Sequence, residues 1–186
     1  RSAIRLNDDV MEHLLDDLRT LSTAQAGMLR VHREPTDLVR LTAEVLHRFE
    51  TEAGTGGVDL ISDHGDRVEA EVDPVRVREV IGNLVRNAIR ATAPGGRVTV
   101  ALTGPPSAPT AEGVTISVAD TGRGIAADDV ERVFDRFHKG PESDGTGLGL
   151  TISRDLVEAH GGSISLRSEE GVGTTVLVSL PSGPAP

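Results

Sequence analysis

The chain has 186 residues, enough for one compact domain with a short appendage. It contains no cysteine, which excludes a disulfide framework and a thiolate metal site. A formal net charge of −10 at pH 7 argues against nonspecific binding to DNA or RNA, so no nucleic-acid partner is predicted.

The first predicted element is one long amphipathic helix over residues 4–30. Its apolar residues recur at steps of three and four, and charged residues lie between them. The apolar positions are Ile4, Val10, Met11, Leu14, Leu15, Leu18 and Leu21. A single helix cannot bury such a stripe alone, so a helix from a neighbouring chain or from a missing segment is expected to cover it.

A second helix is predicted after a break at Glu34 to Asp37. Pro35 forces the residue before it out of the helical conformation, so the first helix ends there. Thr36 or Asp37 can cap the new helix, which is predicted to extend to about Glu52. Its inward positions are Leu38, Leu41, Val45, Leu46 and Phe49.

Two short strands and a third helix are predicted next. The strands cover residues 58–62 and 67–72. Asp73 and Pro74 then form a strong helix start, with the acid as the cap and the proline at the first helical position. This helix is predicted to end near Thr92, before a Pro-Gly-Gly sequence.

The rest of the chain alternates strands with glycine-rich segments. Strands are predicted over residues 97–103, 114–119, 163–167 and 174–180. A short helix is predicted near residues 128–134 and a longer one over residues 148–159. Strands and helices mix without a regular βαβ alternation. The predicted fold class is therefore α+β, a two-layer α/β sandwich in which three helices cover one face of a mainly antiparallel sheet.

The helix that begins at Pro74 carries an unusual polar face. Its predicted buried stripe consists of Val77, Val80, Ile81, Leu84, Val85, Ala88 and Ile89. Asn83, Asn87 and Arg90 stand at i, i+4 and i+7 and therefore share another face. Asparagine is a poor helix-interior residue, so these are either solvated side chains or functional groups. In the functional interpretation, Asn87 offers its amide oxygen to Mg²⁺ and Arg90 reaches a phosphate.

A carboxylate and two glycines follow the strand over residues 114–119. Asp120 at the strand end can accept a hydrogen bond from an exocyclic amine, such as that of adenine. Gly122 and Gly124 allow the backbone to approach a flat ring closely. An ordinary Asp-Gly turn is the alternative interpretation.

A second glycine-rich segment, residues 145–150, opens a helix. Its backbone N–H groups can attract an anion, and the helix dipole adds to that attraction. It lacks the Gly-Lys-Ser/Thr ending of a Walker loop and fits a dinucleotide-binding fingerprint badly. Between the two glycine segments, Phe134 and Phe137 can anchor the chain by packing, and Arg136, His138 or Lys139 can reach a phosphate.

In order and spacing, these segments resemble the sensor histidine kinase family, within the wider group that includes gyrase, the Hsp90 chaperones and MutL. The family's N, G1, F and G2 boxes are similar to residues 79–90, 120–124, 134–139 and 145–150 respectively. The resemblance implies a catalytic ATP-binding domain of the Bergerat type at residues 35–182. It implies part of the dimerisation domain, its second helix with a linker, at residues 1–34, and a tail at residues 183–186.

The resemblance also assigns roles to individual residues. It implies that Asn87 holds Mg²⁺, that Asp120 reads the adenine amine and that residues 123–147 form a mobile lid. The implied catalytic residues are Asn83, Asn87 and Arg90. The implied ATP-binding residues are Asn83, Asn87, Arg90, Asp120, Gly122, Gly124, Ile125, Phe137, Lys139, Gly145, Thr146, Gly147, Leu148 and Gly149.

The implied activity of the full protein is transfer of the γ-phosphoryl group of ATP to a histidine, for relay to an aspartate of a response regulator. ATP, Mg²⁺, a cognate response regulator and a second copy of the chain, joined through the helical segment, are the implied cofactors and partners. In this family the phosphoaccepting histidine is followed by an acidic residue and, a few positions on, by a proline. No histidine of this chain has these neighbours, and His13 precedes Leu14 on what resembles the second dimerisation helix. The chain is therefore expected to bind ATP without autophosphorylating.

The chain is interpreted as a cytoplasmic part of an inner-membrane sensor. No apolar run in it reaches the roughly 18 residues that a membrane helix needs. The chain begins with Arg1 and not with methionine, so it is interpreted as a fragment of a longer protein whose missing part could hold a membrane anchor.

Two alternative functions stay open. An ATPase of the gyrase or Hsp90 type places a glutamate four residues before the metal-binding asparagine, but this chain has Asn83 there, and an amide cannot act as the base. Very slow hydrolysis is therefore predicted. A non-catalytic nucleotide-binding regulator, or an anti-sigma-type serine kinase domain, is disfavoured by the complete set of motifs and by the N-terminal helix.

One residue departs from the family pattern. Many family members carry an aromatic residue at the position of Ala91, and its loss removes one contact with the nucleotide.

Overall fold

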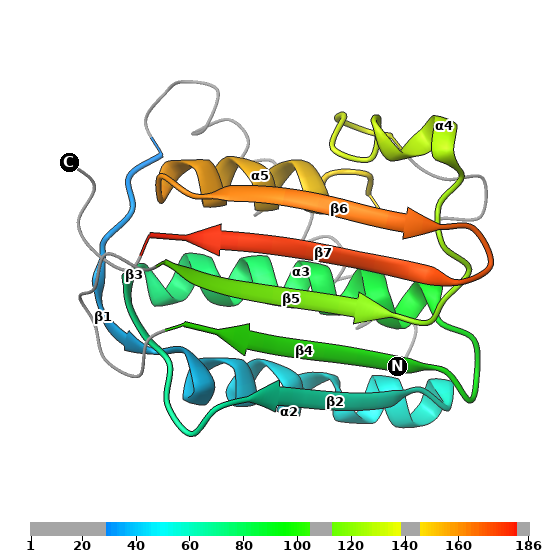
Figure 1. Cartoon of the computed structure of the whole chain (residues 1–186), viewed down its shortest axis with the longest axis horizontal. Helices are drawn as coiled ribbons and strands as arrows, with labels where there is room; N and C mark the ends of the chain where they lie inside the picture. Colours follow the sequence, from blue (N-terminus) through cyan, green and yellow to red (C-terminus); the bar gives the residue numbers. More distant parts are fainter. Residues whose placement is uncertain (1–28, 105–112, 139–145, 182–186) are drawn as a thin grey trace, which may run out of the picture.

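Three helices cover one face of a five-stranded sheet (Figure 1). The structure is a computed structural model and describes residues 29–104, 113–138 and 146–181. The sheet has the strand order β2-β4-β5-β7-β6. Its strands are β2 (Asp59–His64), β4 (Arg97–Thr103), β5 (Val114–Asp120), β6 (Ser163–Glu169) and β7 (Gly173–Leu180). Every neighbouring pair is antiparallel except β2 with β4, so the predicted two-layer α+β sandwich is confirmed.

The three covering helices begin and end close to the predicted positions. They are α2 (Leu38–Gly56), α3 (Pro74–Ala91) and α5 (Gly149–Ala159). Asp37 and Asp73 cap α2 and α3 by accepting backbone N–H bonds, as predicted. α2 continues four residues past the predicted end near Glu52, but it stops within the glycine segment 54–57 that was predicted to end it. The terminating residue is the left-handed Gly57, with φ of 67°. Within the three described ranges, no helix has both the length and the apolarity of a membrane span.

A two-stranded sheet was not predicted. β1 (Glu34–Asp37) pairs antiparallel with β3 (Glu69–Val72), although the sequence indicated only a break at residues 34–37. Proline is compatible with an extended edge strand, so Pro35 does not oppose this pairing. β1 also crosses the predicted domain boundary after residue 34. Of the predicted helix over residues 4–30, positions up to 28 lie outside the described residues, and residues 29 and 30 are not helical.

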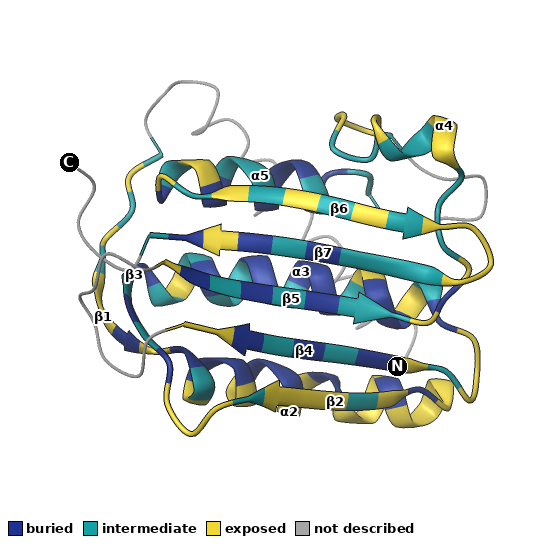
Figure 2. Cartoon of the chain, viewed as in Figure 1, coloured by how far each residue is buried: buried dark blue, intermediate teal, exposed yellow. Residues whose placement is uncertain are grey.

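The core lies between the helices and the large sheet, as Figure 2 shows. Alternate residues of the central strands are buried, which fits a sheet covered on one face. In β4 and β5 the buried positions are Val98, Val100, Leu102, Val114, Ile116 and Val118. The predicted apolar stripe of α3 is buried against them. This packing fixes which end of each strand lies beside which end of α3.

A buried histidine joins the ends of α3 and α5 to the segment before β1. His160 is 2% exposed, and its Nε2 accepts a hydrogen bond from the backbone N–H of Asp73 at 3.1 Å. Its Nδ1 lies 2.7 Å from the carbonyl oxygen of Leu156, so Nδ1 carries the proton and the ring is neutral. The guanidinium of Arg33 donates to the carbonyl oxygen of His160 at 2.8 Å, and the backbone N–H of His32 donates to Oδ2 of Asp73 at 2.9 Å.

We expect His160→Ala to lower the free energy of unfolding by about 2–4 kcal/mol, because it leaves a cavity and an unpaired Asp73 N–H. Burial lowers the pKa of His160, while Leu156 and Asp73 raise it and Arg33 and Arg76 lower it further. The unfolded chain therefore binds the proton more tightly. The stabilisation is complete above the ordinary histidine pKa of about 6.5 and is lost as the pH falls below it.

Urea unfolding of the parent, His160→Ala and the exposed control His47→Ala between pH 5 and 8 tests this expectation. The parent and the control should lose stability on acidification, whereas His160→Ala should show a flatter dependence. Parallel curves for all three proteins would contradict a neutral His160.

Candidate functional site

Asp120 is a half-buried carboxylate at the end of β5. Its Oδ1 accepts hydrogen bonds from the backbone N–H groups of Gly122 at 2.9 Å and Thr174 at 3.3 Å. Burial raises the pKa of Asp120, and these two N–H groups act in the opposite direction. Among the residues that the structure describes, none donates a hydrogen bond to Oδ2. The strand end therefore presents one oriented and partly dehydrated acceptor.

The turn after Asp120 is held tightly between two other parts of the backbone. The N–H of Arg123 donates to the carbonyl oxygen of Ala91, the last residue of α3, at 3.1 Å. A Cβ at Gly122 would lie 2.4 Å from that oxygen, and a Cβ at Gly124 would lie 2.0 Å from the carbonyl oxygen of Glu169. The φ of Gly124 is 68°. Both glycines are thus required by close contacts within the protein, which differs from the predicted approach to a ligand ring.

The polar face of α3 is partly covered. Asn83 is 5% exposed, and its Nδ2 has no hydrogen-bond partner in the described part of the chain. A Cβ at Gly149 would lie 3.7 Å from Cγ of Asn83 and 3.9 Å from Nδ2 of Asn87. The first residue of α5 therefore packs over this face. Asn87 and Arg90 lie further along the helix and are exposed. The interpretation of two solvated asparagines is wrong for Asn83.

The segment before α5 contacts the residues around Phe134 and Phe137. The N–H of Phe137 donates to the carbonyl oxygen of Gly147 at 3.0 Å, and Oγ1 of Thr151 donates to the carbonyl oxygen of Phe134 at 2.9 Å. The guanidinium of Arg154 lies 5.8 Å from the centre of the Phe134 ring. Phe134 thus packs as predicted, and its contacts join this segment to α5.

Two predictions for this region are wrong. Phe137 does not anchor the chain by packing, because its side chain is 66% exposed and its backbone has a left-handed φ of 60°. The short helix α4 (Ala127–Val130) is shorter than predicted, and turns replace its last residues. Leu148 is buried, and its N–H is bonded to Oγ1 of Thr146 at 3.2 Å. Lys139 and Gly145 lie outside the described residues.

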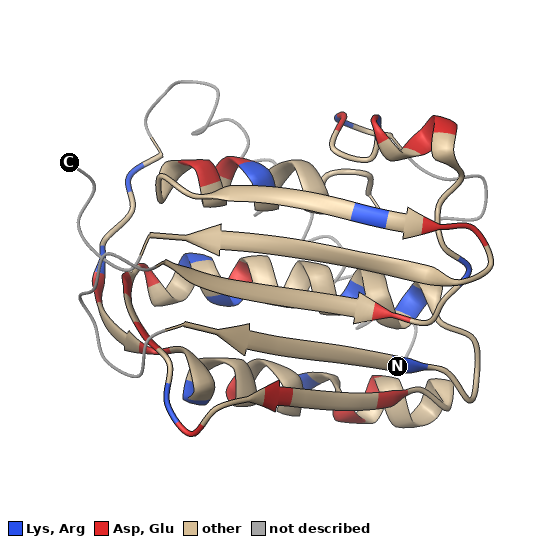
Figure 3. Cartoon of the chain, in the orientation of Figure 1, with Lys and Arg blue, Asp and Glu red and all other residues tan. Residues whose placement is uncertain are grey.

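The predicted groups therefore meet around the C-terminal half of α3. Asp120 is linked through its turn to Ala91, and Asn87 lies one helical turn before Ala91. Gly149 lies against Asn83 and Asn87 from the other side. Basic residues lie in this half of the helix, as Figure 3 shows: Arg90 is exposed, and the guanidinium of Arg86 lies 5.5 Å from the centre of the Phe49 ring on α2. This end of the domain combines an oriented acceptor, an amide oxygen, cationic groups and the N-terminus of α5.

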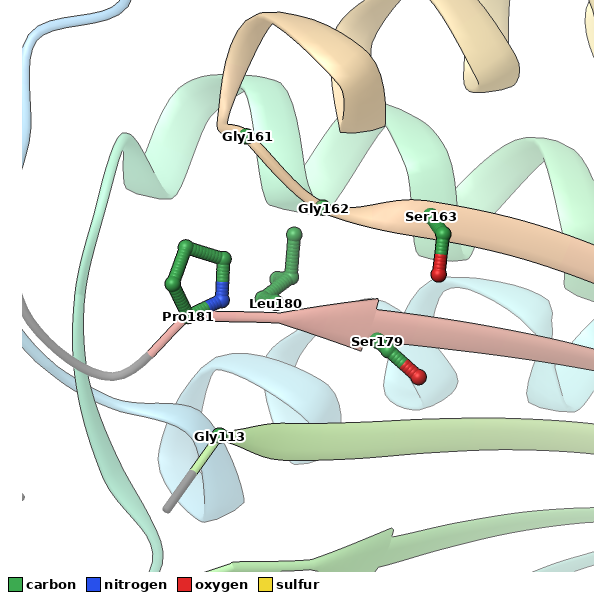
Figure 4. Close-up of a pocket in the computed structure, with 7 residues that line it drawn as sticks. All are labelled: Gly113, Gly161, Gly162, Ser163, Ser179, Leu180 and Pro181. Carbon is green, nitrogen blue, oxygen red and sulfur yellow. The ribbon is translucent and has the colours of Figure 1, made fainter. Parts of the chain in front are cut away.

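A separate cavity lies at the other end of the strands and does not join these groups. It has a volume of about 280 Å³ and is open to solvent. Ser163, Ser179, Leu180 and Pro181 belong to its lining, together with three glycines (Figure 4). These residues lie where β6 begins and β7 ends, whereas Asp120 is at the opposite end of β5. The lining contains no titratable side chain, so it offers no competing catalytic centre.

Comparisons with known proteins agree on one family. Residues 72–184 match the family described as histidine kinase-, DNA gyrase B-, and HSP90-like ATPase. The sensor histidine kinase WalK of Bacillus subtilis is 36% identical over 177 residues, which are 92% of this chain and 28% of WalK. The chain therefore spans less than a third of the length of this relative.

Solved structures with the same fold include ShkA and the catalytic domain of histidine kinase ThkA. Full-length ShkA in complex with AMPPNP superposes with a TM-score of 0.85 at 28% identity, covering 99% of this chain and 38% of ShkA. The nucleotide-free catalytic domain of histidine kinase ThkA superposes with a TM-score of 0.71 at 28% identity, covering 81% of this chain and 96% of that domain. The similarity thus includes a protein solved with an ATP analogue.

Proposed function

The chain belongs to the histidine kinase-, DNA gyrase B-, and HSP90-like ATPase family, and from this premise we propose that ATP and Mg²⁺ bind where α3, β5 and α5 meet. The observation that carries the proposal is the orientation of Asp120. Two backbone N–H groups hold its Oδ1, and no described residue donates to Oδ2, so Oδ2 can accept a hydrogen bond from a ligand. The exocyclic amine of adenine is such a donor, and guanine has a carbonyl oxygen in its place.

The phosphates and the metal are assigned to the face of α3 beyond Asn83. Mg²⁺ takes oxygen ligands and keeps several waters, so the amide oxygen of Asn87 with the nucleotide phosphates can hold it. Within the described ranges no group of three His, Asp or Glu side chains forms a metal site. Arg90 meets a phosphate as a cation. The segment from Thr146 to Gly149 lies against the anion at the start of α5, where the N–H groups of Gly147 and Gly149 face it and that of Leu148 is bonded to Oγ1 of Thr146.

The remaining predicted contacts belong to the same proposal. Ile125, Phe137, Lys139 and Gly145 complete the nucleotide-binding set, and residues 123–147 form its lid. Support comes from the bond between Phe137 and Gly147, which joins two parts of this lid directly.

We propose that the intact protein transfers the γ-phosphoryl group of ATP to a histidine outside this chain and then to an aspartate of a response regulator. The names of the relatives WalK and ThkA support this assignment. Mg²⁺ supplies charge neutralisation when bound. The chain itself contributes orientation through Asp120 and Asn87 and positive charge through Arg90. Dimerisation through the helical segment and a place on the cytoplasmic side of the inner membrane belong to the same proposal.

The proposal is tested by calorimetric titration of the chain with ATP, with and without Mg²⁺, and by a steady-state ATPase assay. ATP should bind more tightly with Mg²⁺, and hydrolysis should stay far below the roughly 1–1000 s⁻¹ of typical enzymes. The reason is that Asn83, buried under Gly149, stands where an ATPase needs a carboxylate base. Rapid turnover would favour the gyrase or Hsp90 type of ATPase. Absence of nucleotide binding would favour a non-catalytic regulator.

A further inference from the structure

A serine on β6 connects the turn after Asp120 with the hairpin opposite it. Oγ of Ser168 accepts a hydrogen bond from the N–H of Ile125 at 2.8 Å and donates one to the carbonyl oxygen of Gly173 at 2.9 Å. It also lies 2.9 Å from Oγ1 of Thr174. A hydroxyl has one proton and two lone pairs, so these three contacts use its full hydrogen-bonding capacity.

The hairpin between β6 and β7 contacts the segment from Asp120 to Ile125 at several points. Thr174 pairs with Asp120 in the sheet, and its N–H reaches Oδ1 of Asp120. The N–H of Gly171 donates to the carbonyl oxygen of Arg123 at 2.7 Å. A Cβ at Gly173 would lie 2.0 Å from the carbonyl oxygen of Asp120, so the two backbones are in direct contact there. Ser168 is bonded both to the hairpin and to the end of this segment.

The segment needs such a connection because its own backbone is permissive. Gly122 and Gly124 interrupt it, and glycine restricts φ and ψ less than any other residue. The bonds of Arg123 fix the middle of the turn, and the bond from Ile125 to Ser168 fixes its end. Without Ser168, the N–H of Ile125 and the carbonyl oxygen of Gly173 both lose a partner.

We propose that Ser168 is a positioning residue that holds Asp120 and the turn over residues 122–125 in the geometry that reads the adenine amine. The inference rests on the proposed function. Ser168 acts through Thr174 and Ile125 and is not placed against the nucleotide. If Ser168 only stabilised the hairpin, its loss would change the affinity for every nucleotide equally. If it positions Asp120, its loss changes mainly the affinity for nucleotides that carry the adenine amine.

The test compares Ser168→Ala, Ser168→Thr and the control Ser165→Ala, which removes an exposed hydroxyl from the same strand. Each protein is titrated calorimetrically with ATP and with purine riboside triphosphate, which lacks the exocyclic amine. Ser168→Ala should weaken ATP binding by about five- to tenfold, the loss expected for one hydrogen-bonded group. It should weaken binding of the analogue less than binding of ATP. Ser168→Thr keeps the hydroxyl and should restore the ATP affinity, and Ser165→Ala should match the parent.

The outcomes separate this inference from the proposed function. If the parent binds ATP and Ser168→Ala binds it equally well, the positioning role is overturned and the function stands. Equal weakening of ATP and the analogue, together with a lower melting temperature, also overturns it. If the parent binds no adenine nucleotide, both proposals fall. Amide hydrogen exchange of Ile125 in the unliganded protein should be faster in Ser168→Ala than in Ser165→Ala, and equal rates count against the role.

Discussion

Replacement of Asp120 by asparagine is expected to abolish adenine-nucleotide binding while the domain stays folded. Asparagine preserves the shape of the side chain, and its Oδ1 can still accept the N–H bonds from Gly122 and Thr174. Its Nδ2 then faces the adenine amine, so two donors oppose each other. Loss of a charged hydrogen bond together with this conflict should weaken ATP binding by at least about a hundredfold, measured by calorimetry.

The same variant is expected to be at least as stable as the parent at neutral pH. Burial raises the pKa of Asp120, so the folded protein binds the proton more tightly than the unfolded chain. The ionised carboxylate therefore opposes folding at neutral pH, and this unfavourable contribution decreases as the pH falls toward the ordinary range of an aspartate. Asparagine carries no charge and removes the penalty. The melting temperature of the unliganded protein at pH 7 measures the difference.

Asp63→Asn is the matched control, because Asp63 is an exposed aspartate on β2 of the same sheet. It should change neither ATP affinity nor stability. An Asp120→Asn protein that binds ATP with parental affinity would remove Asp120 from the adenine site. A large loss of stability would instead show that the carboxylate serves the fold.

The second large effect is expected for Asn87→Ala, which should erase the dependence of ATP binding on Mg²⁺. Asn87 is exposed on α3, and alanine is a better helix former, so the fold should be preserved. ATP affinity with Mg²⁺ should fall by at least about tenfold, to the value that the parent shows without the metal. If the intact protein has the proposed kinase activity, its phosphoryl transfer should be lost as well, because metal positioning contributes to that reaction.

Asn87→Asp provides the conservative comparison, since it retains an oxygen ligand at the same position. Titrations of all three proteins with ATP, in Mg²⁺ and in a chelator, measure the metal-dependent increment. We expect Mg²⁺ to increase the ATP affinity of Asn87→Asp and to leave the ATP affinity of Asn87→Ala unchanged. An undiminished increment in Asn87→Ala would place the metal on other residues.

The sequence predicted those features that depend on residues within a few turns of one another. Asp37 and Asp73 cap α2 and α3 because a carboxylate needs only the next few N–H groups. The boundaries of β4 were predicted correctly for a similar reason, since alternating apolar residues and turn signals define that strand locally. The motifs also placed Asp120 at a strand end, where the structure has it.

Local sequence patterns did not predict strands, pairings or burial that depend on a segment far away in the chain. β1 exists because β3, which follows α2 in the chain, offers it a hydrogen-bonding edge, and four residues containing a proline carry no strand signal. The parallel pairing of β2 with β4 likewise depends on α3 crossing between them. Helical spacing placed Asn83 and Asn87 on one face, but only the packing of Gly149 shows that Asn83 is buried and Asn87 exposed.

Ser168 shows the same limit at the level of one side chain. A serine in a strand of alternating exposure is ordinary, and its three contacts come from Ile125 and from the beginning of β7. The two site glycines were identified correctly as places of close approach, but their contacts are with Ala91 and Glu169. The glycines thus indicated where the chain has no room for a side chain, and the structure shows that neighbouring backbone segments occupy that space.

By itself the sequence determined the three covering helices, most strands, the fold class and the identity of the candidate nucleotide-binding groups, because caps, periodicity and glycine motifs act over short distances. Only the tertiary structure decided that Asp120, Asn87 and Ser168 belong to one end of the domain. The strand order and the burial of apolar faces bring these residues together, and both depend on contacts between segments that are far apart in the chain.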